Sequence, residues 1–489
     1  MPLWADAQKP DIRCRRAGRA WRPTQQRRNM TMKLPSKKTV LSLVISSLLA
    51  AACSASAVAG DVDTSGLEQP EPQQQFIVHL RGGRSLQHSE STMQAALDRA
   101  GSRLHVGTGD MRVLRQMAAG PMVVRAERAL DRAEAGAWMA ALASDPDVDH
   151  VQVDRILQPA LDPNDVRLNE QWAFSNSNAS LNVRQAWDKA TGAGQVVAII
   201  DTGRTRHPEL DANTLPGYDF ISSASMAGDG NGRDDNPDDV GDSQSGSSSS
   251  WHGTHVAGTV AAATNNGQGV AGTAFDAKLV HVRVLGKGGG YTSDIADGMV
   301  WAAGGTVNGV PRNANPAKVL NLSLGGQGAC DRAWQAAVDA AIRNGATVVV
   351  AAGNSNADVS RFTPASCRGV VAVAATTSRG ARASFSNYGA GITLAAPGEG
   401  ILSTLNTGTT TPEGPGYAVY NGTSMAAPHV AGVVALMQSA ADGKLTPDQV
   451  VGILKTTARP LPGACSQGCG AGIANAKGAV DSALEAASR

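Results

Sequence analysis

The sequence has few charged and few aromatic residues for its length. Of its 489 residues 17% are charged and 4% are aromatic, and the formal net charge at pH 7 is +1. A nucleic-acid-binding protein usually has a marked excess of basic residues, so this balance gives no indication of a nucleic-acid or bulk acidic partner. The 55 glycines favour a packed α/β protein with many tight turns over a coiled coil or a disordered chain.

Cysteine and long apolar runs are also scarce. No cysteine spacing matches a pair of zinc-binding Cys-x-x-Cys motifs. Four cysteines lie beyond residue 60 and allow three pairings, of which proximity in the sequence favours Cys330 with Cys367 and Cys465 with Cys469. The apolar run at 39–52 is too short for a typical membrane span, so we expect no stable membrane association.

The first 59 residues differ in composition from the rest. Residues 1–38 are strongly basic, and two interpretations are open: a long basic tail, or translation that starts at Met30 or Met32. We favour the second, because residues 32–59 read as a signal peptide with a basic segment, an apolar segment and small residues before Gly60. Residues 1–31 are then a leader extension outside the protein, and the chain is expected to be secreted.

Beyond this leader the pattern predicts a linker at 60–74, a small α+β domain at 75–158 and a large domain at 159–489. In the small domain we expect strands at 75–80, 121–124 and 148–153, with helices at 92–100 and 126–144. In the large domain apolar β-rich runs alternate with helical stretches such as 252–263, 293–303 and 332–343. The expected strands are 196–201, 278–285, 319–324, 347–353, 370–376 and 392–396. This alternation predicts a doubly wound, mostly parallel sheet flanked by helices, with functional groups at the carboxyl ends of the strands.

Three polar residues lie at positions where a doubly wound fold usually has its functional residues. Asp201 ends the first apolar run, His252 opens a helical stretch, and Ser424 follows a Gly-containing turn at the start of another. Each has a plainer explanation as a turn or capping residue. Together they provide a carboxylate, a general base and a nucleophile, and Asn354, after the run at 347–353, could bind an oxyanion. His255 does not suggest a metal site with His252, because a zinc-protease helix has histidines at i and i+4 with a glutamate between them.

With these residues the chain resembles the subtilisin-like serine proteases, or subtilases. Seven stretches carry the resemblance; they occur in family order and are spread over the region 165–459. They are IIDTG (199–203), HGTHVAGT (252–259), LNLSLGG (320–326), AAGN (351–354), ASFSNYG (383–389), AAPG (395–398) and NGTSMAAPHVAG (421–432). The resemblance implies a serine endopeptidase in which Asp201, His252 and Ser424 form the triad, and Asn354 binds the oxyanion.

The resemblance also implies how substrates bind. Ser323, Leu324 and Gly325 would form one extended edge and Gly288, Gly289 and Gly290 the opposing one, so that a protein or peptide substrate is added as a β-strand between them. Residues 351–354 would wall the pocket for the side chain before the cleaved bond. Asp358 either biases that pocket toward basic side chains or is exposed to solvent; we favour exposure and expect broad specificity.

The small domain resembles the inhibitory propeptide of secreted subtilases, through FIVHL (76–80) and the segment 145–154. The resemblance implies an intramolecular inhibitor that is removed by self-cleavage within 157–163. It also implies a monomeric mature enzyme.

Calcium is the implied cofactor. The acidic loop 229–242 provides the candidate ligands Asp229, Asp234, Asp235, Asp238 and Asp242, although a solvated acidic loop is the alternative. The resemblance adds a second candidate site formed by Gln171, Glu209 and Asn266. A noncatalytic peptide-binding module on the same fold remains the competing interpretation of the whole chain.

Overall fold

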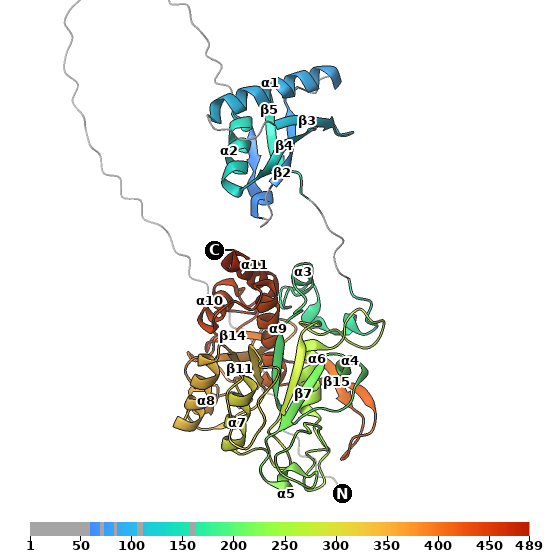
Figure 1. Cartoon of the computed structure of the whole chain (residues 1–489), viewed down its shortest axis with the longest axis vertical. Helices are drawn as coiled ribbons and strands as arrows, with labels where there is room; N and C mark the ends of the chain where they lie inside the picture. The colour runs from blue at the N-terminus through green and yellow to red at the C-terminus, as the bar shows by residue number, and fades with distance from the viewer. Residues whose placement is uncertain (1–58, 69–72, 83–85, 105–110, 156–161, 489) are drawn as a thin grey trace, which may run out of the picture. The chain divides into compact units, whose positions relative to one another are not determined.

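The computed structural model describes residues 59–68, 73–82, 86–104, 111–155 and 162–488 (Figure 1). The leader extension and all but the last residue of the expected signal peptide lie outside the described residues, as do residues 156–161 of the expected processing segment. No helix in the described ranges is long and apolar enough to cross a membrane.

The small domain has a five-stranded sheet with two helices, where the sequence pattern predicted three strands and two helices. The strand order is β1-β5-β2-β4-β3, with β1 parallel to β5 and the other pairs antiparallel. Its core contains Phe76, Trp138 and Met139, none more than 2% exposed. The elements are β1 (Asp61–Asp63), η1 (Thr64–Glu68), β2 (Gln73–Leu80), α1 (Leu86–Leu104), β3 (Met111–Gln116), β4 (Met122–Leu130), α2 (Arg132–Ala143) and β5 (Val148–Val153).

Two boundaries of the small domain differ from the expectation. In the segment 61–68, expected in a linker, β1 pairs with β5 and η1 buries Leu67 in the core. The expected helix at 126–144 begins only at Arg132, because β4 continues to Leu130 and Asp131 starts the helix with a capping box to Glu134. The strand β3 was missed, since its residues are mostly polar and show little alternation.

The large domain is built on a seven-stranded sheet in which every pair of neighbours is parallel, which confirms the predicted fold class. The order is β14-β13-β11-β9-β6-β8-β7. The strands are β6 (Val196–Asp201), β7 (Thr214–Asp219), β8 (Lys278–Arg283), β9 (Val319–Leu322), β11 (Thr347–Ala351), β13 (Val371–Thr376) and β14 (Leu394–Pro397). Because β11, β9 and β6 are neighbours, the segments after their carboxyl ends meet at one edge.

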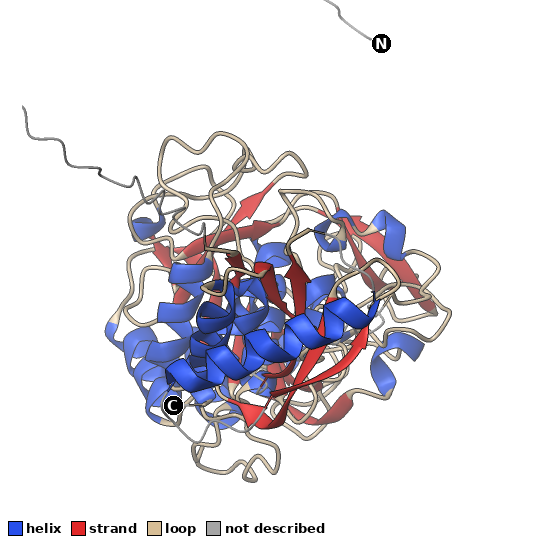
Figure 2. Ribbon diagram, turned by 90° about the horizontal axis from the view of Figure 1, so that it is seen from above, coloured by secondary structure: helices blue, strands red, loops and turns tan. Residues whose placement is uncertain are grey.

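Helices cover both faces of this sheet (Figures 1 and 2). Along β6, Val197 and Ile199 pack on one core while Ala198 and Ile200 pack on the other, as alternation in a strand requires. The first core includes α3 (Arg184–Trp187), α6 (His252–Ala261), α9 (Thr423–Ala440), α10 (Pro447–Thr457) and α11 (Ala476–Ala487); the second includes α7 (Thr292–Ala302) and α8 (Arg332–Arg343).

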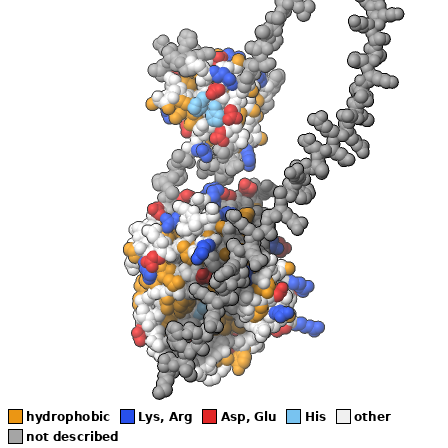
Figure 3. All heavy atoms as spheres, turned by 180° about the vertical axis from the view of Figure 1, so that it is seen from behind, with side chains coloured by type: hydrophobic (Ala, Val, Ile, Leu, Met, Phe, Trp, Pro, Cys, Tyr) orange, Lys and Arg blue, Asp and Glu red, His pale blue; other side chains and the backbone are white. Residues whose placement is uncertain are grey.

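Short elements and two disulfide bonds complete the large domain. The sequence pattern did not reveal the short helices α4 (Pro208–Asp211) and α5 (Ala224–Ala227). It also did not reveal the antiparallel pair β10 (Gly326–Gln327) with β12 (Phe362–Thr363) or the hairpin β15 (Ile401–Asn406) with β16 (Pro415–Tyr420). The segments η2 (Leu168–Glu170), η3 (Trp172–Phe174) and η4 (Val359–Arg361) are single turns. Cys330 is bonded to Cys367 and Cys465 to Cys469. On the face seen in Figure 3, acidic and basic side chains are interspersed.

Candidate active site

Asp201 and His252 form a close pair at the carboxyl end of β6. Asp201 is the last residue of the strand and is fully buried, whereas the His252 side chain is 21% exposed. The His252 Nδ1 lies 2.7 Å from Asp201 Oδ1, which also accepts a hydrogen bond from the Thr202 amide at 2.8 Å. A buried carboxylate on Nδ1 holds the proton there and leaves Nε2 free to accept one.

Small residues and one strained residue bring α6 to this position. A Cβ on Gly253 would lie 2.2 Å from the Gly203 carbonyl oxygen, so only glycine allows the helix to approach the turn after β6. Trp251, directly before the histidine, has a left-handed backbone (φ 49°), and its buried ring donates to the Gly408 carbonyl at 2.6 Å. The ring anchor stabilises a conformation that a tryptophan rarely adopts.

Carboxylates beyond Asp201 surround the imidazole. Asp239 is 2% exposed and accepts a hydrogen bond from the Thr202 hydroxyl at 2.7 Å, and burial raises its pKa to about 6. For His252, burial lowers the pKa, but Asp201, through its charge and hydrogen bond, and the charges of Asp242 and Asp239 outweigh burial. The net pKa of His252 is therefore raised above 6.5.

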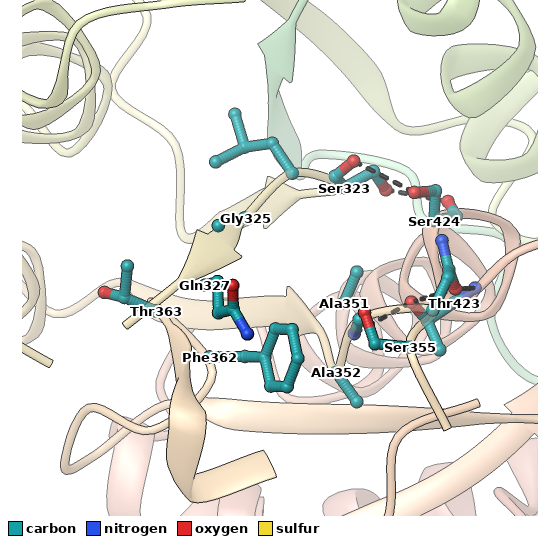
Figure 4. A pocket seen from close by; sticks show the side chains of 14 residues that line it. Ser323, Gly325, Gln327, Ala351, Ala352, Ser355, Phe362, Thr363, Thr423 and Ser424 are labelled. Carbon is teal, nitrogen blue, oxygen red and sulfur yellow. Dashed lines mark hydrogen bonds between the residues drawn. The ribbon is translucent and has the colours of Figure 1, made fainter. Parts of the chain in front are cut away.

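Ser424 lies in the first turn of α9, where backbone N–H groups have no partner within the helix. Its hydroxyl donates to the Ser323 carbonyl at 3.1 Å, and the Ser323 hydroxyl donates back to the Ser424 carbonyl at 2.7 Å (Figure 4). Within the described residues the Ser424 hydroxyl does not hydrogen-bond to His252, so a transfer of its proton to the imidazole would first require a rotation of the hydroxyl. Catalytic hydrogen bonds often tighten only when substrate is bound.

Asn354 stands beside the serine. Its Oδ1 accepts hydrogen bonds from the Thr423 amide at 2.8 Å and from the Thr423 hydroxyl at 2.9 Å. With the oxygen engaged by the residue that precedes the serine, the Asn354 amide nitrogen remains to donate elsewhere. The side chain is exposed, so a substrate oxygen can reach it.

Two adjoining pockets form the cleft. The first pocket has a volume of about 400 Å³ and is lined by Ser424, Asn354, residues 351–353 and residues 323–327. Opposite Ser424 it is closed by Phe362 and Gln327 (Figure 4). The second pocket, of about 760 Å³, contains His252 and has residues 288–290 and 323–327 in its walls. The two edges expected to hold a substrate strand therefore line one cleft. Asp358 does not line either pocket and instead caps η4.

Comparison with known proteins agrees with this geometry. The model of the subtilase family matches residues 192–472. An extracellular protease of Xanthomonas campestris pv. campestris is 58% identical over 440 residues, or 88% of this chain and 76% of the relative. An extracellular basic protease of Dichelobacter nodosus is 44% identical over 474 residues, or 93% of this chain and 78% of the relative.

The chain belongs to the subtilase family.

A solved protease structure from Pseudoalteromonas arctica supports the same assignment, with a TM-score of 0.65 and 52% identity over 66% of this chain and 99% of that chain. The expected fold and the expected enzyme class, a serine protease, are thus confirmed.

In the acidic loop of this subtilase, several of the five candidate calcium ligands bind groups of the protein. Asp229 lies 2.7 Å from Arg283 Nη1, Asp238 lies 3.2 Å from Arg204 Nε, and Asp242 binds Ser250. Nowhere in the described chain are three or more His, Cys, Asp or Glu side chains grouped to hold a metal ion. The five candidate ligands therefore do not converge on one point in the described chain, and calcium binding by some of them stays a prediction; they are Asp229, Asp234, Asp235, Asp238 and Asp242.

The second predicted set is a closed hydrogen-bond network. Glu209 is 1% exposed, and it accepts from the Asn266 amide at 3.1 Å and from the Tyr417 hydroxyl at 3.0 Å. Gln171 binds the backbone of Ala271 through both its oxygen and its nitrogen. Burial raises the pKa of Glu209. Because hydrogen-bond donors occupy the carboxylate, this arrangement does not fit a cation.

Sequence reasoning missed several residues of the site. These residues are Trp251, Asp239 and Phe362. Nothing in the local sequence marks them as part of the site, except that they lie near the family motifs. Phe362 reaches the first pocket only because β12 pairs with β10, an arrangement of two-residue strands that periodicity cannot reveal. A tryptophan directly before the expected histidine was a visible but unused signal.

Proposed function

We propose that Asp201, His252, Ser424 and Asn354 hydrolyse peptide bonds through an acyl-enzyme. The observation that carries the proposal is the 2.7 Å contact between His252 Nδ1 and buried Asp201, in a cleft continuous with Ser424. The known relatives are named as extracellular proteases, and this chain has the same family fold.

The chemistry follows from these contacts. His252 Nε2 takes the Ser424 proton as the hydroxyl attacks the carbonyl carbon, and it returns the proton to the leaving amine. Asp201 stabilises the imidazolium that forms between the two steps. Water then attacks the acyl-enzyme with His252 again as base, which releases the acid product and restores the serine.

Asn354 stabilises the oxyanion of each tetrahedral intermediate. Its amide nitrogen and the backbone N–H groups at the start of α9 offer donors where negative charge develops. The substrate strand lies between residues 288–290 and 323–325, with the side chain before the cleaved bond in the first pocket. Since no charged residue lines that pocket in the described chain, we propose broad specificity for uncharged side chains there.

Cleavage of casein by the processed protein tests the proposal. We expect robust cleavage by the wild type and a loss of roughly 10⁶-fold in kcat for Ser424→Ala, a magnitude known for subtilisin itself. Equal inertness of the two proteins after removal of residues 60–160 would instead favour a noncatalytic peptide-binding module.

We also propose that the enzyme is made as a secreted, self-processing zymogen. The small domain has its own sheet and core, as a separately folding inhibitory propeptide requires, and the relatives are named extracellular. Ser424→Ala should accumulate as an unprocessed precursor in a host without other proteases. Normal maturation of this variant there would show that another enzyme makes the cut.

Structural calcium is a further part of the proposal and rests on family membership. Of the predicted ligands, Asp229 and Asp234 lie on one turn and both hydrogen-bond to Asn231. These three residues would hold the ion through carboxylate and amide oxygens, which are ligands that calcium prefers. The bound ion would stabilise the turn, and no catalytic step depends on it.

A further inference from the structure

One carboxylate stands in the wall of the substrate cleft. Among the described residues that line the two pockets, Asp242 and His252 are the ionisable side chains, and the others are neutral. Asp242 lines the second pocket together with His252 and the two substrate-binding edges. The acidic character of this part of the cleft therefore depends on a single side chain.

Asp242 is held firmly in this position. Its Oδ1 accepts from the Ser250 amide and its Oδ2 from the Ser250 hydroxyl, both at 2.6 Å. The segment is tied to the rest of the domain by Ser249, whose amide donates to the Thr409 carbonyl at 2.7 Å and whose hydroxyl donates to the Thr410 carbonyl at 2.9 Å. The carboxylate is thus fixed before a substrate arrives.

Within the described residues Asp242 forms no ion pair, although its charge acts on His252 and contributes to the raised pKa of that residue. Asp229 and Asp238 in the same loop pair with arginines, and Asp201 pairs with His252. The hydrogen-bond partner of Asp242 among the described residues is the neutral Ser250. An acidic group that is half-buried beside a cleft and has no cationic partner attracts a cation of the ligand.

The geometry of an extended substrate indicates which residue would meet it. When a peptide lies as a strand between residues 288–290 and 323–325, successive side chains point to opposite sides. If the residue before the cleaved bond fills the first pocket, the preceding residue points away from that pocket, toward the side of the cleft where His252 and Asp242 lie.

We propose that Asp242 gives the enzyme a preference for substrates with lysine or arginine at the second residue before the cleaved bond. The preference deepens the proposed function and rests on it. Such a side chain would place its cation against the Asp242 carboxylate, while the first pocket still takes an uncharged side chain.

Internally quenched peptides that differ only at this position test the proposal. Each has leucine before the cleaved bond and lysine, glutamine or glutamate before the leucine, with the cut verified by mass spectrometry. For the processed wild type we expect kcat/KM for lysine to exceed that for glutamine about fivefold, the order of one partly shielded ion pair, and glutamate to be the poorest. Raising the salt from about 0.05 to about 0.5 M should reduce the ratio.

The lysine-to-glutamine ratio of kcat/KM, measured within one enzyme, separates a change of specificity from a general loss of activity. Asp242→Asn keeps an acceptor for Ser250 but removes the charge, so the lysine-to-glutamine ratio should fall to about one. Asp358→Asn is the matched control, because Asp358 is an exposed acid outside both pockets, and it should keep the wild-type ratio.

Two results would overturn the proposal while the proposed function stands. One is a wild-type ratio near one in an enzyme whose activity requires Ser424. The other is an Asp242→Asn variant that loses activity equally on all peptides, which would mean that Asp242 only positions Ser250. If no peptide is cleaved in a Ser424-dependent manner, the proposed function fails first.

Discussion

The two sides of the cleft are built from opposite kinds of groups. Around His252, at the start of α6, carboxylates gather: Asp201 in contact, with Asp239 and Asp242 nearby. Around Ser424, at the start of α9, the partners are a neutral amide and hydroxyls, from Asn354, Thr423 and Ser323.

This difference matches the charges that the proposed mechanism of peptide hydrolysis would create. A positive imidazolium develops on the first side, and fixed carboxylates stabilise it. A negative oxyanion develops on the second side, where neutral donors and the positive end of a helix stabilise it and a carboxylate would repel it. We infer that the fold separates the acidic groups from the oxyanion site.

The largest expected effect on catalysis comes from removing the charge of Asp201, the carboxylate in direct contact with His252. Asp201→Asn should lower kcat by about 10⁴-fold, because an amide favours the wrong imidazole tautomer and does not stabilise the imidazolium. Steady-state kinetics with a peptide substrate measures this effect, and circular dichroism checks the fold. A loss below about tenfold would contradict the role given to Asp201; Asp358→Asn is the control that should remain active.

Removing the neutral donor should have a smaller effect. Asn354→Ala should lower kcat by roughly 10²- to 10³-fold with little change in KM, a magnitude known for the corresponding donor in subtilisin. Because Asn354 also accepts from Thr423, the melting temperature must be measured alongside. An unchanged kcat, or a rise in KM alone, would place Asn354 outside oxyanion binding.

The pH profile sharpens the comparison further. The pKa of His252 is raised above 6.5, so kcat/KM should rise with pH through a value above 6.5 as the imidazole becomes a free base. A raised histidine pKa stabilises the folded state below 6.5, and this contribution is lost as pH rises through the folded pKa. Activity should therefore appear in the window where this stabilisation disappears.

Asp242→Asn removes one of the charges that raise this pKa, so it should shift the rising limb to lower pH. Titration of kcat/KM from pH 5 to 9 in wild type and variant provides the measurement. If the rising limb of the wild-type pH profile is centred below pH 6.5, the carboxylates do not outweigh burial in setting the pKa of His252.

Removal of metal ions by a chelator should have the smallest effect on catalysis. It also distinguishes Asp242, the carboxylate in the cleft, from metal ligands. EDTA should lower the melting temperature of the processed enzyme, since loss of a ligand bound to the native state destabilises it. The shift should be smaller in Asp234→Asn. The lysine-to-glutamine ratio of the surviving activity should not change, because Asp242 faces the cleft; an unchanged melting curve would count against calcium.

Much of the fold was readable from the sequence. The six predicted strands of the large domain all occur, since buried parallel strands are continuous apolar runs that periodicity detects. The pairing of Cys330 with Cys367 and of Cys465 with Cys469 also occurs. The pair β10 with β12 was missed, because its strands have two residues each and pair across a long stretch of sequence. The hairpin β15 with β16 was missed as well, and the residues of β16 are exposed or half-buried.

By itself, the sequence determined which residues are candidates for catalysis and where along the chain they lie. Each motif combines a reactive side chain with the local turn or helix start that presents it. Tertiary structure alone decided which neighbours those residues have. Asp242, expected among metal ligands, lines the cleft because its loop folds back onto Ser250 and Thr410. Glu209, expected in the second metal site, accepts a hydrogen bond from Tyr417 of β16. A side chain's charge is local information, but its partner can lie 208 residues away, and only the fold brings the two together.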